Sequence, residues 1–175
     1  MKLRTLSILA ALLAAPVAAQ EPAELNDLEM AHVAVVASNI DIAYAHLALA
    51  FSDNPAVREF AETMIRDHSA VNGQVVALAR RLNVQAQDNP FSRQLLAQAA
   101  DAKDELSSLR GAEFDRAYIE NEVAYHEAVN DIVADAFIPN IENADVRQAF
   151  EAALGIFRAH QQHAEQLAQR LARGR

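Results

Sequence analysis

The chain has 175 residues, no cysteine, and 24 acidic against 15 basic residues, which gives a formal net charge of -9 at pH 7. A strongly acidic surface repels phosphate backbones and anionic lipid headgroups, so nucleic-acid binding is disfavoured. The lack of cysteine argues against a disulfide framework, a cysteine zinc site and a lipoprotein anchor.

Residues 1–19 have the pattern of a secretory signal peptide. A basic start, Lys2 and Arg4, precedes an apolar run over 6–15, and small residues follow at 17–19. The apolar run is shorter than the ~20 residues that a stable membrane span requires. We therefore expect cleavage at the end of this segment and export to the periplasm of a Gram-negative bacterium. A retained N-terminal anchor is the alternative.

Residues 20–175 are expected to form one domain. Loss of the two basic leader residues shifts the formal charge from -9 to -11. About 155 residues are enough to bury a stable core without disulfides. No second apolar segment is expected to reach membrane length, so we expect no stable membrane insertion after signal removal. The sequence indicates no protein partner, and we expect a monomer or a homodimer.

The composition after the leader favours helix throughout. Alanine, leucine, glutamine, glutamate and arginine dominate, and the whole chain has only four glycines. Breaks and caps occur at Asn54-Pro55, Asp88-Asn89-Pro90 and Pro139-Asn140. Between them, helices are predicted over about 26–51, 55–82, 91–109 (a shorter one), 112–137 and 144–171.

The lengths of the connections indicate the fold. Two helix pairs have short connections, and a segment of roughly 28 residues, 83–110, separates the pairs. Short hairpin loops with one long crossover are typical of ferritin-like bundles. We therefore predict an all-α fold, a ferritin-like four-helix bundle whose long crossover contains an extra shorter helix.

Each long helix places a polar side chain where its apolar stripe should continue. His68 and His160 interrupt runs of apolar residues spaced three or four apart, and Asp41 faces inward on the first helix. Glu122 and His126 lie one turn apart on another helix, so both can point at one spot. At about 1.5 Å of rise per residue, all five are expected within about two turns of one another along the bundle.

Metal coordination is one chemistry that accounts for this set. Burying unpaired charged groups costs several kcal/mol, and a metal ion offsets that cost by binding carboxylates and neutral imidazoles. We therefore predict a site for Fe, Mn, Zn or Cu formed by Asp41, His68, Glu122, His126 and His160. The chain lacks the two Glu-x-x-His pairs of di-iron bundles. A mononuclear or degenerate site is thus favoured over a redox enzyme such as a peroxidase or catalase.

A metal-free polar network is the alternative. Asp41 would pair with His160, and Glu122 with His68, which would fix the register of the helices. The protein would then be a non-enzymatic envelope scaffold or binding module. Weaker candidates are predicted at the flank of the bundle or at its surface: Asp67, His163, His32 and His46. The three tyrosines are predicted to pack in the core or to hydrogen-bond the polar layer: Tyr44, Tyr118 and Tyr125.

Three strings of residues carry a family resemblance. They are Asn54-Pro-Ala-Val-Arg-Glu-Phe-Ala-Glu-Thr-Met-Ile-Arg-Asp-His68, Phe114-Asp-Arg-Ala-Tyr118 followed by His126, and Phe157-Arg-Ala-His160. Together they resemble a ferritin-like bacterial family, domain of unknown function 4142, over roughly 26–171. Its members are often described as predicted outer membrane or periplasmic proteins. The resemblance implies the bundle and export, but no particular activity. Many members have Glu where this chain has the shorter Asp41.

Overall fold

The computed structural model describes residues 20–174, and every regular element in that range is helical. The long helices are α1 (Asp27–Phe51), α2 (Pro55–Leu82), α4 (Gly111–Asp131) and α6 (Ala144–Arg173), with a shorter α3 (Pro90–Ser108). A 3-10 turn, η1 (Pro22–Glu24), a π-helical segment, η2 (Ile132–Phe137), and the one-turn α5 (Ile138–Asn140) complete the set. The predicted all-α class is confirmed. The predicted signal peptide, 1–19, lies outside the described residues.

Asparagine side chains begin most of these helices. The N-cap residues whose side chains accept hydrogen bonds from first-turn amides are Asn26, Asn54, Asn89 and Asn143. Pro55 and Pro90 follow two of them, at the first helical position, where a missing N–H costs nothing. Local sequence chemistry therefore sets where the helices begin.

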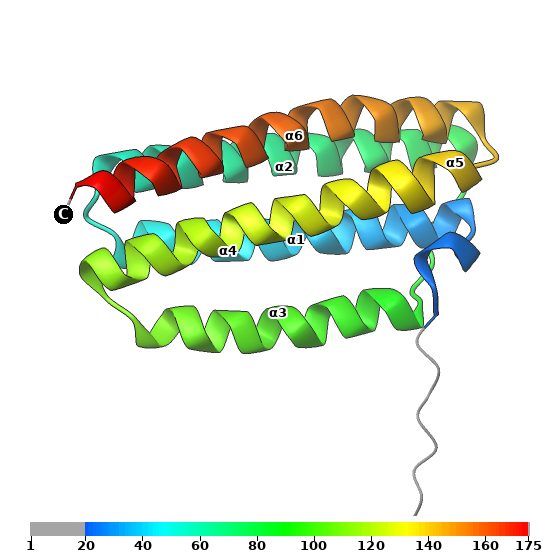
Figure 1. Cartoon of the computed structure of the whole chain (residues 1–175). Helices are drawn as coiled ribbons and strands as arrows, with labels where there is room; N and C mark the ends of the chain where they lie inside the picture. Colours follow the sequence, from blue (N-terminus) through cyan, green and yellow to red (C-terminus); the bar gives the residue numbers. More distant parts are fainter. Residues whose placement is uncertain (1–19, 175) are drawn as a thin grey trace, which may run out of the picture.

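The four long helices pack against one another, while α3 lies outside them against α1 (Figure 1). The α1–α2 connection and the turn before α6 lie at opposite ends of the molecule (Figure 1). Two apolar clusters fill the interior, one around Phe60, Phe114 and Tyr118 and the other around Phe137 and Phe150. Burial of each such aromatic contributes about 1.5–3 kcal/mol. Along α2, α4 and α6, the buried residues His68, Glu122, His126 and His160 fall between these clusters.

The helix predicted over 112–137 does not continue as a regular α-helix. It changes to a π-helix at Ile132, where the amide of Ile138 donates to the carbonyl of Val133, five residues earlier. Pro139 follows at once. It has no amide hydrogen, so it cannot donate the next hydrogen bond of an α-helix. The segment predicted as a helix over 112–137 is therefore helical to its end, but its last six residues are π-helical.

Helix α1 is long and apolar enough, by length and composition, to cross a membrane. The expectation that no second apolar segment reaches membrane length was therefore wrong. Half of its most apolar stretch is buried inside the protein, where it packs against α2 and α3. Asp41, in the middle of this helix, has no exposed surface. A core helix rich in alanine and valine passes the same test.

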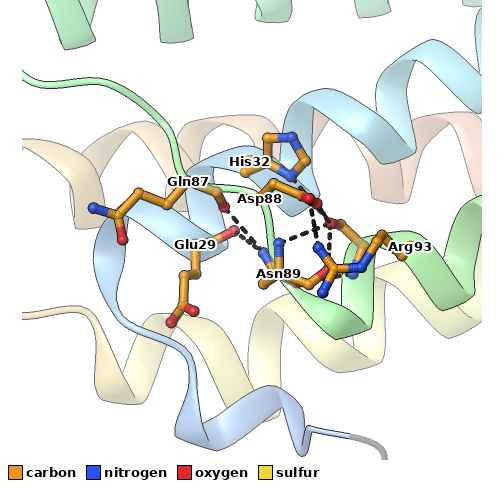
Figure 2. A network of polar contacts seen from close by, with 7 residues as sticks. Glu29, His32, Gln87, Asp88, Asn89 and Arg93 are labelled. Atoms are coloured by element: carbon orange, nitrogen blue, oxygen red, sulfur yellow. Dashed lines mark hydrogen bonds and ion pairs between the residues drawn. The ribbon is translucent and has the colours of Figure 1, made fainter.

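A polar network fixes the start of α3 against α1 (Figure 2). The Nδ2 of Asn89 lies 3.2 Å from both the carbonyl oxygen of Glu29 and that of Gln87, and donates to them. Its Oδ1 accepts from the amide of Ser92 at 2.8 Å. The Nδ1 of His32 lies 3.1 Å from the hydroxyl of Ser92. His32, which we predicted at the surface, is therefore partly buried in this network.

Replacement of Asn89 by alanine removes both the cap of α3 and its link to α1. We expect Asn89→Ala to lower the free energy of unfolding by about 1–2 kcal/mol and to speed amide exchange in α3. Gln98→Ala, on the exposed face of the same helix, should change stability by less than about 0.5 kcal/mol. Urea unfolding with hydrogen–deuterium exchange measures both. Equal effects of the two variants would contradict the role given to Asn89.

Candidate metal centre

The five side chains that we predicted as ligands lie together in the interior. They come from all four long helices: Asp41 on α1, His68 on α2, Glu122 and His126 on α4, and His160 on α6. None is more than 4 % exposed. They form two overlapping groups whose donor atoms lie within 4.8 Å of one another. The three histidines make one group, and His126 with the two carboxylates makes the other.

Asp41 lies at the centre of the contacts. Its Oδ2 is 3.4 Å from Nε2 of His68 and 3.5 Å from Nε2 of His126. Glu122 approaches the other side of His126, with Oε2 3.6 Å from Nδ1. The pairs expected for a metal-free network, Asp41 with His160 and Glu122 with His68, are therefore not the closest ones. Helix rotation decides which side chains meet, and sequence spacing does not fix it.

A backbone contact sets the tautomer of His126. Its Nδ1 lies 3.0 Å from the carbonyl oxygen of Glu122, one turn earlier in α4. A carbonyl oxygen only accepts, so the hydrogen bond assigns the proton to Nδ1. The lone pair of His126 is then on Nε2, the atom that faces Asp41.

A contact with Asp67 likewise sets the tautomer of His160. Its Oδ2 lies 3.0 Å from Nε2 of His160, and its other oxygen pairs with Arg66 at 2.8 Å. The hydrogen bond from Arg66 holds the pKa of Asp67 below its usual range, so this carboxylate is ionised and accepts. The proton of His160 is then on Nε2, and its lone pair is on the buried Nδ1. We had predicted Asp67 at the flank or in solvent, but its side chain is only 27 % exposed.

Phe157 holds the ring of His68 in place. The two rings are stacked, with centroids 4.6 Å apart and planes 8° from parallel. The same phenyl ring meets His126 edge-on, with centroids 6.5 Å apart. The orientation of both imidazoles is thus fixed by packing as well as by polar contacts.

Burial sets the charge state of the cluster. It raises the pKa of Asp41 to about 7, partly offset by the neighbouring Glu122, and raises the pKa of Glu122 well above its usual range, with the charge of Asp41 adding to the effect. It lowers the pKa of His68 to about 2 and that of His126 to about 4, and it lowers the pKa of His160 despite Asp67. Near neutral pH the imidazoles are therefore neutral, and the two carboxyls retain proton between them.

Many polar atoms in the cluster have no hydrogen-bond partner within residues 20–174. These atoms are both ring nitrogens of His68, Nε2 of His126, Nδ1 of His160, and those oxygens of Asp41 and Glu122 that the proton held between the two carboxyls leaves unpaired. A buried polar group left unpaired costs about 1–3 kcal/mol, and a charged one costs more. Acceptor atoms are the large majority of this set. A cation is the kind of ligand that can satisfy several buried acceptor atoms at once.

Three tyrosines surround this layer in neutral form. The hydroxyl of Tyr125 donates to the carbonyl of Ala37 at 3.0 Å, whereas within the described residues that of Tyr118 has no partner. Burial and the nearby carboxylates raise the pKa of Tyr44 to about 12 and those of the other two well above their usual range. The remaining histidines lie apart, with His163 edge-on to Phe60 and His46 exposed.

The fold and the cluster together define an all-helical protein with a buried histidine–carboxylate centre. The chain belongs to the family described as Domain of unknown function (DUF4142), whose model matches residues 12–167. The family resemblance seen in the sequence is thereby confirmed. No curated protein and no solved structure shows significant similarity to the chain.

The raised pKa of Asp41 predicts how the metal-free protein responds to pH. The folded state holds this proton more tightly than the unfolded state, so stability is lost as pH rises from about 4 through about 7. The Asp41→Asn variant lacks this loss. We expect it to exceed the wild type in free energy of unfolding by up to roughly 4 kcal/mol at pH 8 and by little at pH 4. Urea unfolding in EDTA tests this, and a difference independent of pH would contradict it.

Proposed function

We propose that the protein is an exported, ferritin-like four-helix bundle that binds one first-row transition metal ion between α1, α2, α4 and α6. The observation that carries the proposal is the set of buried donor atoms without partners that converges from all four helices. A cluster of this kind is destabilising unless it is neutralised, because each helix contributes at least one buried ionisable group. Metal coordination is the simplest way to satisfy it.

Two of the separations between donor atoms match those around a tetrahedral metal. Two ligand atoms that each lie about 2.1 Å from a tetrahedral metal are about 3.4 Å apart. The Oδ2 of Asp41 is 3.4 and 3.5 Å from the Nε2 atoms of His68 and His126. These separations are longer than hydrogen bonds of about 2.7–3.2 Å, which a metal-free network would form. We assign Nδ1 of His160 as the fourth donor, with Glu122 beside the site.

The donor set and its protonation also fit a metal. Three imidazoles with one or two carboxylates suit Zn, Cu, Fe or Mn, and no thiolate takes part. The histidines are already neutral, which is the form that binds. Asp41 must give up its proton on binding, so uptake should release a proton to the buffer, while Glu122 beside the site keeps its own. With two carboxylates at most in reach, we assign metal binding and no redox turnover.

The contact between Asp67 and His160 matches the second layer of many metal sites. In such sites a carboxylate accepts from the outer ring nitrogen, which orients the imidazole and raises its basicity. Asp67 is itself held by Arg66. The basic, apolar and small residues of the leader support export, and the opposite placement of the two helix connections supports the ferritin-like arrangement.

Metal uptake by the purified protein tests the proposal directly. After treatment with EDTA and dialysis, one equivalent of Zn, Cu, Mn or Fe should bind per chain, measured by elemental analysis and calorimetry. A free metal concentration 100 times Kd should stabilise the fold by about 2.7 kcal/mol. His126→Gln should lose this stabilisation.

His46→Gln is the matched control, because His46 is an exposed histidine outside the cluster. It should bind metal like the wild type. If no metal binds stoichiometrically, and none raises the melting temperature, then the metal-free network is the correct interpretation. Equal loss of binding in both variants would point to adventitious surface sites.

Removal of the outer carboxylate tests the role of Asp67 separately. We expect Asp67→Ala to weaken metal affinity by about 10–100-fold while leaving one ion per chain, because His160 loses its orienting partner. Glu62→Ala, an exposed acidic position on the same helix, should have no such effect. Equal affinities for the two variants, from competition with a chelator, would show that Asp67 does not support the site.

A further inference from the structure

A cavity of about 390 Å³ adjoins the cluster. His68, His126 and Tyr125 line its inner end, and residues near the start of α1 and the turn before α6, among them Asp27 and Asn143, line its outer end. Its volume falls within the ~300–1,000 Å³ range of small-molecule pockets. The cavity therefore connects the region of the proposed metal to the end of the bundle.

The wall of this cavity is long and almost wholly apolar. Along α2 it runs from His68 to Leu82, which is roughly 21 Å at 1.5 Å per residue. Representative wall residues are Ala34, Val75, Leu78, Ala149 and Ala153. Val75, Leu78 and Leu82 belong to the apolar stripe of α2, yet they are only partly buried, because they border this space.

The shape and the charges limit what the cavity accepts. A peptide helix, about 10 Å across, is too wide for a cavity of this volume and length. Sugars and other polar ligands would find almost no hydrogen-bond partners along its wall. At the outer end Asp27 is a carboxylate that accepts from the amides of Glu142 and Asn143, so an anionic group is unfavourable there. A metal at the inner end would attract one.

We propose that the cavity binds a linear aliphatic molecule with a small anionic head, of the class of medium-chain fatty acids. The chain lies along α2 and α6, and the head lies beside His68 and His126. The position of the head rests on the proposed metal function, whereas the binding of the chain rests on the cavity alone. Burial of each CH₂ group supplies the driving force.

Two probes test the binding of the aliphatic chain separately from the position of the anionic head. Dodecanoate and 1-dodecanol are titrated, below their aggregation limits, into metal-loaded and metal-free protein. Both probes should bind the loaded protein. Removal of the metal should weaken dodecanoate at least tenfold and leave dodecanol within about threefold. Ala153→Leu and Ala34→Phe, which fill the cavity, should weaken both probes at least tenfold with metal stoichiometry unchanged. Ala100→Phe, on the exposed face of α3, should change neither.

The outcomes distinguish the two proposals. Metal uptake without binding of either probe would overturn the proposed ligand and leave the metal function standing. Dodecanol binding that Ala153→Leu abolishes, in a protein that takes up no metal, would support the aliphatic cavity and contradict the metal function. Binding that both filling variants leave unchanged would place the probes elsewhere and overturn the inference.

Discussion

The burial of five ionisable side chains is the constraint on which the rest of this structure depends. A domain is stable by only about 5–15 kcal/mol, and several buried groups without partners cost a comparable amount. Apolar clusters on both sides and capped helix ends hold the four helices together against that cost. The same packing places Oδ2 of Asp41 within 3.5 Å of Nε2 of His68 and of Nε2 of His126. A bound cation would convert this cost into binding free energy.

The contacts around the cluster prepare its donor atoms. The carbonyl of Glu122 and the carboxylate of Asp67 each take the proton of one imidazole, which leaves the other nitrogen of His126 and of His160 free. Phe157 stacks on His68 and fixes its plane. These imidazoles are thus oriented by their neighbours, which would lower the entropy cost of binding the proposed ion. The apolar cavity that ends at His68 and His126 places the same atoms at the polar end of the proposed ligand pocket.

The sequence predicted the helices well because their boundaries have local causes. Asn54 and Asn143 cap their helices by accepting from amides only two or three residues further along the chain, and Pro55 follows Asn54 at the first helical position. Polar residues on apolar stripes identified the buried cluster for a similar reason, since helical periodicity is local. Asp67 was missed because its contact depends on the rotation of α2 against α6. The π-helical turn at Ile132 and the cavity depend on packing between helices. The apolar stripe of any one helix therefore does not predict them.

The central claim is that one metal ion sits among Asp41, His68, His126 and His160. Anomalous diffraction from crystals of the metal-loaded protein, collected on both sides of the absorption edge, tests it most directly. We predict a single peak per chain, bonded to Oδ2 of Asp41, to the Nε2 atoms of His68 and His126, and to Nδ1 of His160. The absence of a peak there, with Asp41 and His68 drawn together to hydrogen-bond distance, would contradict the account.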